Sequence, residues 1–224
     1  MPFPHLMFLS GLIKIFEIGI LNNISMVLYF LHASFQATKN FSPGGFHMKE
    51  KQLTTYHLAL TGIFAALIAV FTAFFCHIPV GVNGGYIHFG DAIIYLAASL
   101  LPLPYAMAAG AIGGGLADLA TAPLWAPATV IIKMLIVLPL TSKQPRILCR
   151  RNMAAPVLSF LISGTGYFLA EALLFGTKTA FISSISGSFL QSFGSAVFFY
   201  LLGSALDKSK IKQLLFSANS RCRA

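Results

Sequence analysis

Long apolar runs, broken by proline, glycine or basic residues, dominate this chain from residue 55 to residue 203. Hydrophobic residues make up 57% of the sequence and charged residues only 9%, whereas about 25% of the residues in a soluble domain are charged. An apolar run of about 20 residues is long enough to cross a bilayer as a helix. The sequence therefore predicts a polytopic integral membrane protein, with no room for a separate soluble catalytic domain.

The apolar runs and their breakers predict six transmembrane helices, and so an all-α bundle. The expected spans are residues 55–76, 87–101, 104–122, 127–142, 153–175 and 181–203. The second and fourth are short and bounded by proline or glycine, which is typical of tilted or broken helices near a binding site. We expect three parts: an extension over residues 1–47, without a function or forming a seventh helix, a membrane domain over 48–207, and a basic tail over 208–224.

Most basic residues fall in segments that an alternating topology places on one side of the membrane. They precede the first span, join the fourth to the fifth and follow the sixth: Lys49, Lys51, Lys143, Arg146, Arg150, Arg151, Lys208, Lys210, Lys212, Arg221 and Arg223. Cytoplasmic loops of membrane proteins carry an excess of Lys and Arg. We therefore expect both termini in the cytoplasm, and we attribute the net charge of +9 to topology rather than to nucleic-acid binding.

Four charged residues lie within the predicted spans, and all four fall in the outer half of the predicted bundle: Asp91, Asp118, Lys133 and Glu171. A charge at the bilayer centre costs roughly 2.5–3.5 kcal/mol, so such residues commonly serve a ligand or a transport pathway. Structural alternatives remain open. Asp118 and Lys133 could form an ion pair, Asp91 could cap a helix, and Glu171 could face the water outside.

Aromatic and polar residues near these charges complete the candidate ligand site. Trp125, Tyr86 and Tyr95 offer ring surfaces for a flat heterocycle, such as a pyrimidine, thiazole, pyridine or flavin compound. Asn83 lies in a glycine-rich loop that is suited to act as a lid, and His88 precedes the second span. An ordinary connecting turn and a solvated histidine are the alternatives.

Small residues indicate close helix packing at two places. Thr61, Ala65, Ala69 and Ala73 recur every four residues along the first span, which fits either packing within the bundle or docking onto another membrane subunit. The sequence GAIGGGLAD, residues 110–118, lacks the pattern of a phosphate-binding loop. We expect its glycines to let neighbouring helices, or a flat ligand, lie against the third span.

The sequence offers no motif for catalysis or metal binding. Nucleophile triads, metal-ligand spacings and Walker sequences are missing, and the three cysteines are scattered singly. We therefore expect no enzyme activity, no cofactor and no ATP hydrolysis by this chain. One competing hypothesis is a membrane structural or assembly protein whose buried charges pair with one another and bind no small molecule.

Three segments carry a family resemblance: KEKQLTTYHLALTGIFAALIAVFTAF, YIHFGDAIIYLAASLL and GGGLADLATAPLWAPATVIIK. Over about residues 48–205 the chain resembles the substrate-binding S components of energy-coupling factor (ECF) vitamin transporters, in particular the riboflavin-type S-component group.

The resemblance implies a six-helix bundle in the plasma membrane of a prokaryote. It implies capture of a water-soluble vitamin or vitamin precursor at the outer face, and delivery inward with a T component and two cytoplasmic ATPases. It also implies that the small-residue stripe on the first span is the T-component docking face. Residues 1–47 are not part of the family pattern, and the identity of the vitamin does not carry over.

Overall fold

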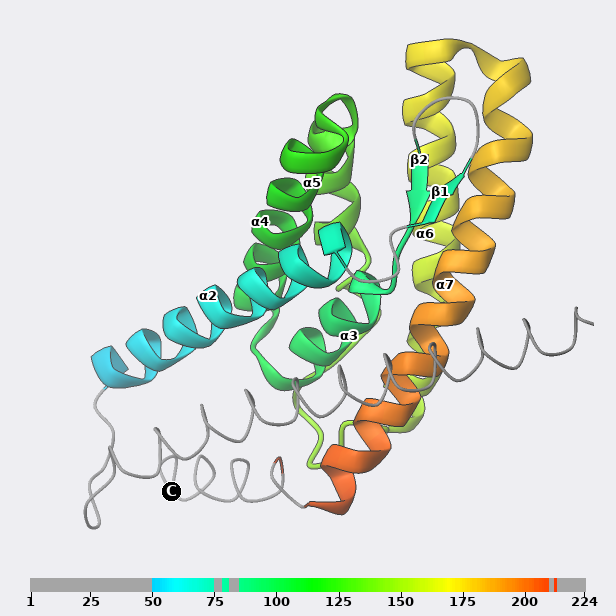
Figure 1. Cartoon of the computed structure of the whole chain (residues 1–224). Coiled ribbons are helices and arrows are strands. Elements are labelled where there is room, and N and C mark those ends of the chain that lie inside the picture. The colour runs from blue at the N-terminus through cyan, green and yellow to red at the C-terminus, as the bar shows by residue number, and fades with distance from the viewer. Residues whose placement is uncertain (1–49, 75–77, 81–84, 210–211, 213–224) are drawn as a thin grey trace, which may run out of the picture. The chain divides into compact units, whose positions relative to one another are not determined.

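The computed structural model describes residues 50–74, 78–80, 85–209 and 212. In chain order its elements are α2 (Glu50–Phe74), β1 (Ile78–Val80), β2 (Gly85–Ile87), α3 (Gly90–Leu100), α4 (Leu103–Thr121), the 3-10 helix η1 (Pro123–Trp125), α5 (Ala126–Leu135), α6 (Arg150–Phe175) and α7 (Thr177–Lys208) (Figure 1). The expected extension at residues 1–47 and the tail from residue 213 lie outside the described residues.

Six α-helices in the described ranges correspond to the six predicted spans. Three segments are long and apolar enough to cross a membrane: Thr54–Phe74, Arg150–Phe175 and Gly187–Lys208. The second and fourth predicted spans are short helices, as expected. The fourth ends at Leu135 rather than at residue 142, because Pro139 lacks an N–H group and disfavours helical backbone at the preceding residue.

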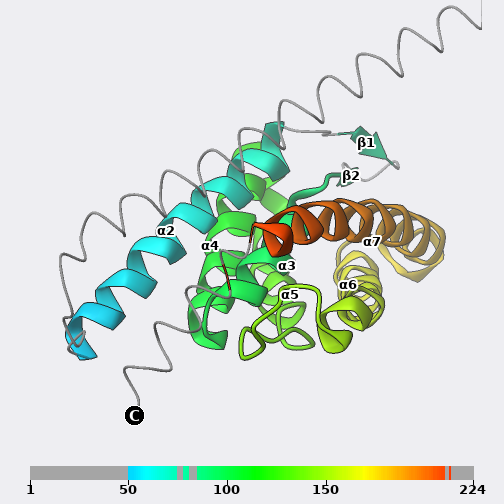
Figure 2. The same ribbon diagram turned by 90° about the horizontal axis from the view of Figure 1, so that it is seen from below.

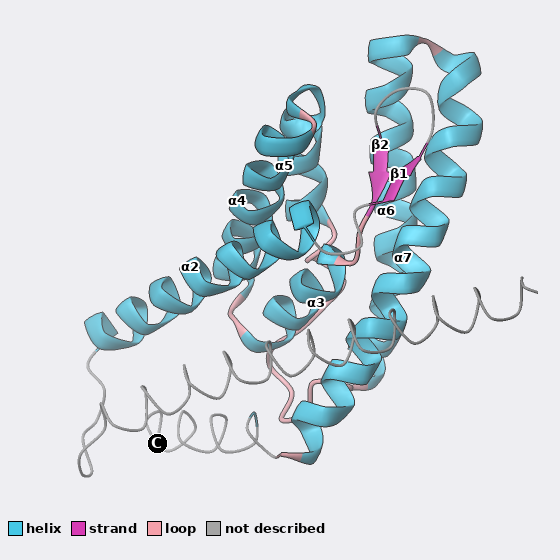
Figure 3. Cartoon of the chain, in the orientation of Figure 1, coloured by secondary structure: helices cyan, strands magenta, loops and turns pink. Residues whose placement is uncertain are grey.

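A short β-hairpin is the departure from the all-α expectation among the described residues (Figure 3). β1 and β2 pair antiparallel, with Ile78 opposite Ile87 and Val80 opposite Gly85. The hairpin joins α2 to α3, and two residues separate the end of β2 from the start of α3. Residues 81–84, where we expected a lid containing Asn83, lie outside the described residues.

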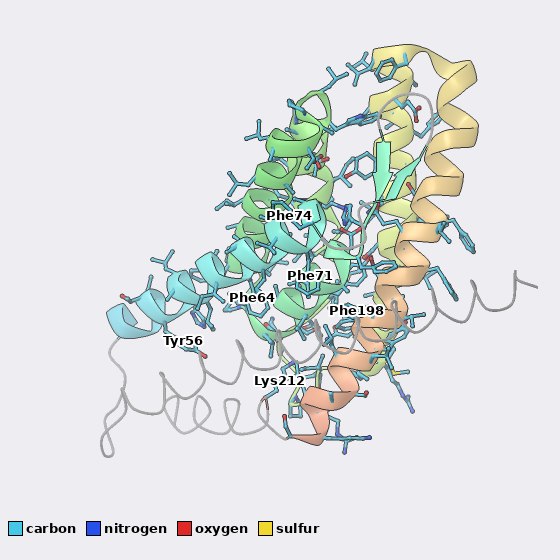
Figure 4. The ribbon with its side chains drawn as sticks, in the orientation of Figure 1. Tyr56, Phe64, Phe71, Phe74, Phe198 and Lys212 are labelled. Carbon is cyan, nitrogen blue, oxygen red and sulfur yellow. The ribbon has the colours of Figure 1, made fainter. Side chains whose placement is uncertain are left out.

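The short helix α3 forms the centre of the core. It contacts α2, α4, α6 and α7, and each of its residues from Gly90 to Ser99 is buried. Around it, α2 packs along α4, and α6 packs along α7, as the view in Figure 2 also shows. Phe71 of α2 and Phe198 of α7, labelled in Figure 4, have ring centroids 6.2 Å apart and close the core beside α3.

The glycines of α4 allow its neighbours to approach closely, as predicted. A Cβ atom on Gly113 would lie 2.6 Å from the backbone oxygen of Ala65 in α2, and one on Gly114 would lie 2.8 Å from Cγ of Lys133 in α5. Atoms of α2 and α5 therefore occupy the space in which we considered a flat ligand as an alternative. The absence of a Cβ atom lets the backbone of α4 approach both neighbouring helices.

This packing corrects part of the expected docking stripe on α2. Thr61 and Ala65 are buried within the bundle, whereas Ala69 and Ala73 are half-buried. For Thr61 and Ala65 the structure favours the alternative, which is packing inside the chain. Exposed small residues of α2 include Ala59, Gly62 and Ala66.

Asn152 organises the end of the bundle where α6 begins. Its Nδ2 atom donates hydrogen bonds to Oγ of Ser99 at 3.1 Å and to the backbone oxygens of Thr141 and Ile147 at 3.0 and 2.9 Å. Its Oδ1 atom accepts a hydrogen bond from the backbone N–H of Thr141 at 2.8 Å. A neutral amide with both donor and acceptor capacity thus satisfies polar backbone groups at the two ends of a partly exposed connecting segment.

Asp207 holds the same connecting segment from α7. Its carboxylate accepts hydrogen bonds from the backbone N–H groups of Ile147 and Leu148 at 2.8 and 3.0 Å. Lys212 donates to the backbone oxygen of Arg146 at 3.2 Å. We call Asn152, Asp207 and the segment 141–148 that they hold the polar lock.

Candidate functional site

A second group of polar residues lies away from the polar lock. Asp91 is eight residues before Ser99 on α3, which corresponds to about 12 Å along a helix axis. Residues from the beginning of α3, from α5 and the preceding η1, from the ends of α4 and α6, and from the first half of α7 contribute to this group. Their hydrogen bonds and ring contacts connect all five helices. We call the group the charge cluster; its members are Asp91, Asp118, Trp125, Thr129, Lys133, Tyr167, Glu171 and Gln191.

An ion pair forms the centre of the charge cluster. Nζ of Lys133 lies 2.5 Å from Oδ1 of Asp91, and both side chains are essentially inaccessible to solvent. Nε2 of Gln191 donates to Oδ2 of Asp91 at 2.8 Å. Side chains from α5 and α7 thus bind both oxygens of the α3 carboxylate, and this arrangement fixes its orientation.

These contacts rule out two structural interpretations, one for Asp91 and one for Asp118. The N-cap of α3 is Phe89, and the carboxylate of Asp91 bonds to side chains, so a helix-capping role for Asp91 is wrong. The ion pair predicted between Asp118 and Lys133 is replaced by the pair between Asp91 and Lys133. Sequence spacing alone did not reveal that α3 runs through the middle of the bundle, where it brings Asp91 to α5.

Asp118 is tied to the cluster through a hydroxyl group. Oγ1 of Thr129 donates a hydrogen bond to Oδ2 of Asp118 and lies 3.1 Å from the hydroxyl of Tyr167. The ring of Tyr167 has Nζ of Lys133 5.6 Å from its centroid, a distance at which a cation is attracted to an aromatic face. Asp118, Lys133 and Tyr167 therefore surround one small region contributed by α4, α5 and α6.

Glu171 lies on the same face of α6 as two aromatic residues. Tyr167, Glu171 and Phe175 follow one another at intervals of four residues, which places them on one side of a helix. The ring of Trp125 is 6.1 Å from the ring centroids of both Tyr167 and Phe175. Glu171 is only 4% exposed, so the alternative that it faces outside water is wrong.

The remaining candidates fall into three groups. His88 is buried, and its Nδ1 atom accepts a hydrogen bond from the N–H of Gly90 at 3.0 Å, which excludes the solvated alternative. Tyr95 is fully buried and packs edge-on against Phe199 at 5.8 Å, so it belongs to the core rather than to an open ring surface. Tyr86 lies in β2, and its side chain is outside the described part of the structure, as is Asn83.

The sequence analysis missed three members of the cluster. Thr129 precedes Lys133 by four residues and Tyr167 precedes Glu171 by four residues, so each shares a helix face with a charged residue that we had selected. Gln191 is the one amide side chain in α7. An uncharged hydrogen-bonding residue in an apolar helix is a weaker signal than a charge, but the helical spacing was available.

Three serine hydroxyls near these helices retain hydrogen-bonding capacity. The Oγ atoms of Ser163, Ser192 and Ser195 are buried and have no hydrogen-bond partner among the described residues. Ser163 precedes Tyr167 by one helical turn, and Ser192 follows Gln191 directly. Leaving a buried hydroxyl unsatisfied costs about 1–3 kcal/mol, so a ligand or water that bonds to these groups would be stabilised.

A bundle of apolar helices that buries charged and polar side chains on one side of its core defines the class of membrane proteins that bind or carry a polar solute. Residues 52–208 match the family described as ECF-type riboflavin transporter, S component, and the chain belongs to this family. It is a non-catalytic, substrate-binding membrane subunit of an ECF importer, as the resemblance predicted. No curated protein matches the chain.

Proposed function

We propose that the chain captures a water-soluble vitamin or vitamin precursor at the charge cluster and delivers it inward together with a T component and two ATPases. The observation that carries this proposal is the buried ion pair of Lys133 and Asp91 with Gln191 bound to the same carboxylate. Charges inside a membrane bundle are expensive and commonly mark a substrate pathway. Because the chain belongs to the S-component family, we expect the molecule bound at this site to be a transported substrate.

The distribution of basic residues supports an orientation for this function. Lys143, Arg146 and Arg150 are exposed beside the polar lock, and the positive-inside rule assigns that end to the cytoplasm. The charge cluster then lies in the outer half of the bundle, both termini are cytoplasmic, and six helices cross the plasma membrane of a prokaryote. Substrate from outside would meet the charge cluster first.

The competing function is that of a structural or assembly protein. Asp91 and Lys133 are each other's partner, so the ion pair by itself is compatible with that role. Charge pairing does not account for the hydroxyls of Ser163, Ser192 and Ser195, which have no partner among the described residues. We therefore favour ligand binding.

The test is thermal unfolding of the full chain in detergent against a panel of vitamins and their precursors. A ligand present at 100 times its dissociation constant adds about 2.7 kcal/mol to the stability of the native state. We expect one selective shift, which Lys133→Ala and Asp118→Ala abolish and which Asp207→Ala, at the other polar site, preserves. A folded protein that no member of the panel stabilises would favour the structural alternative.

Docking onto the T component would use the exposed small residues of α2. A Cβ atom on Gly62 would meet nothing within 4 Å, and Ala66 is exposed beside the half-buried Ala69 and Ala73. Small side chains allow another helix to approach closely in lipid. We expect Ala66→Trp to reduce co-purification with the T component while the ligand-induced shift persists; Ala154→Trp, on an exposed position of α6, is the matched control.

A further inference from the structure

Polar side chains continue along α7 from the charge cluster. Gln191 donates to Asp91 of α3 at 2.8 Å, Ser192 follows it directly, and Ser195 lies four residues after it. Residues four apart share one face of a helix, so Ser195 lies on the side of α7 that Gln191 turns toward α3. Both serines are buried, with exposures of 4% and 0%. The polar surface of the charge cluster therefore extends along α7.

Ser163 approaches the ion pair from α6. One turn before it on the same helix face is Ser159, whose Oγ atom donates to the backbone oxygen of Ile136 at 3.0 Å. One turn after it is Tyr167, whose ring centroid lies 5.6 Å from Nζ of Lys133, the cation of the ion pair. Both contacts are made with α5, so Ser163 lies between them on the side of α6 that faces α5. The serines of α6 and α7 thus approach the ion pair from two helices.

The hydroxyls of these serines have unused hydrogen-bonding capacity. Among the described residues, the Oγ atoms of Ser163, Ser192 and Ser195 have no hydrogen-bond partner, and no side chain of the three is more than 4% exposed. A hydroxyl within a helix can donate to the carbonyl four residues earlier, as Ser99 and Thr165 do. Each hydroxyl can donate one hydrogen bond and accept two, and this capacity is available to a molecule that reaches it.

The stretches of helix that carry these serines have no charged residues. α6 has no Asp, Glu, Lys or Arg between Arg151 and Glu171, and α7 has none between Lys178 and Asp207. Hydroxyl groups pair with uncharged donors and acceptors, such as hydroxyl, amide and ring carbonyl groups, and satisfy them without a net charge. The serines therefore suit an uncharged polar part of a substrate.

Packing around α6 is less tight next to Ser163 than further along the helix. A Cβ atom on the buried Gly164 would have Cβ of Ser188 as its nearest neighbour, at 3.9 Å, which is an ordinary contact. A Cβ atom on Gly166 would lie 2.7 Å from Cγ1 of Ile132 and would clash. An additional atom is thus accommodated beside Ser163, between α6 and α7.

We propose that Ser163, Ser192 and Ser195 are substrate-binding residues and that they bind an uncharged hydrogen-bonding group of the substrate, such as a hydroxyl, an amide or a ring carbonyl. This inference rests on the proposed function and names the part of the substrate that these residues select. An analogue without that group leaves the hydroxyls unsatisfied in the complex and binds less tightly. The three serines are therefore determinants of specificity.

The experiment removes the hydrogen-bonding group once from the compound and once from the protein. Three pairs of compounds differ in one uncharged polar part: riboflavin and lumiflavin, which lacks the polyhydroxyl chain; pyridoxine and 4-deoxypyridoxine; and nicotinamide and 3-acetylpyridine, which lacks the amide nitrogen. Each compound is titrated by calorimetry into the full chain in detergent, as the wild type and as Ser163→Ala, Ser192→Ala and Ser195→Ala.

We expect a pair in which the compound with the polar part binds the wild type about three- to tenfold more tightly than its analogue, the factor that corresponds to one net hydrogen bond. Ser163→Ala, Ser192→Ala and Ser195→Ala lower the affinity for that compound by a similar factor and leave the affinity for the analogue unchanged. Ser159→Ala is the matched control. It removes a buried hydroxyl of the same helix that is bound to Ile136, and it leaves both affinities unchanged.

Thermal unfolding without any vitamin gives a second readout. Replacing a hydroxyl that has no partner should keep or raise the melting temperature, because alanine buries no polar group. Ser159→Ala should lower the melting temperature by about 2–4 °C, since the backbone oxygen of Ile136 loses its donor. Opposite signs for Ser159→Ala and Ser163→Ala, one turn apart, would distinguish a hydroxyl that binds substrate from one that stabilises the fold.

Three results would overturn the inference, and they differ in what they imply for the proposed function. Equal affinity of the wild type and all three alanine variants for a vitamin that binds would remove the serines from the substrate site and leave vitamin capture intact. A loss of stability in all three vitamin-free variants as large as that of Ser159→Ala would do the same, because protein or water would then satisfy these hydroxyls. Failure of these compounds and of the wider vitamin panel to bind the folded wild type would refute the proposed function together with the inference.

Discussion

The polar lock and the charge cluster use polar side chains in the same apolar bundle in opposite ways. In the polar lock, Asn152 satisfies backbone groups of Thr141 and Ile147 and the hydroxyl of Ser99. In the charge cluster, Lys133 and Gln191 bind the side chain of Asp91, which is not a backbone group. The polar lock completes hydrogen bonds of the backbone, whereas the charge cluster positions ionised side chains against one another.

This is the difference that we expect between a structural site and the proposed substrate site. Removing polar groups from the polar lock leaves peptide groups without partners, so stability suffers. Replacing a buried ion pair with well-packed apolar residues is often neutral or stabilising. If the ion pair can be removed without loss of stability, its role is other than structural, and ligand binding is the role that we propose for it.

The largest expected effect comes from breaking the ion pair on one side. Lys133→Met leaves Asp91 buried without its cation and should lower the free energy of unfolding by about 3–5 kcal/mol. The double variant Asp91→Leu with Lys133→Met should recover most of that loss. Denaturant titration in detergent measures both. A double variant as unstable as the single one would show that the pair has a structural role.

Much of this architecture is predictable from the sequence, and the limits have physical causes. Apolar runs and their breakers predicted the six helices, because the bilayer constrains helix length and polarity. They did not predict the partner of Lys133, since Asp91 is 42 residues away and a helix-packing arrangement brings the two together. They also missed the hairpin β1–β2, where short strands flanked by glycines resemble any connecting turn.

Asn152→Ala should produce the next largest effect, at the polar lock. Several hydrogen bonds are lost and a buried carbonyl of Ile147 loses a donor, so we expect a loss of roughly 3 kcal/mol, since each unsatisfied group costs about 1–3 kcal/mol. Ligand affinity, measured by titration calorimetry on the same preparation, should stay within about twofold of the wild-type value, because substitutions at well-separated sites act nearly independently. A large loss of affinity would mean that the two sites are coupled.

Asp207→Ala should have a smaller effect than Asn152→Ala. Asp207 is only half-buried, and water can replace it as the acceptor for the N–H groups of Ile147 and Leu148. We expect a loss of about 1 kcal/mol, typical of a partly exposed hydrogen bond. Thermal unfolding compared with Asp207→Asn, which retains one acceptor oxygen, measures the combined contribution of the charge and of the second acceptor oxygen. A loss as large as that of Asn152→Ala would contradict this ranking.

The last expected effect is a pH dependence at Lys212, next to the polar lock. Burial lowers the pKa of Lys212 to about 8, whereas an unfolded lysine titrates near a pKa of about 10.4. Between these two values the unfolded state binds more protons than the folded state, so stability rises with pH across that interval and is unaffected below it.

The measurement is the melting temperature of the wild type and of Lys212→Met from pH 7 to pH 10.5, a range that spans both values. The wild type should gain stability relative to the variant as the pH rises. Parallel curves would show that folding does not lower the pKa of Lys212.

The most direct test of the central claim is ligand binding by the double variant Asp91→Leu with Lys133→Met, measured beside Asn152→Ala. We take the vitamin that stabilises the wild type in the thermal panel and titrate it into both variants by calorimetry. We predict that the double variant is folded and does not bind, whereas Asn152→Ala is less stable and binds normally. Binding by the double variant with wild-type affinity would contradict the assignment of the charge cluster as the substrate site.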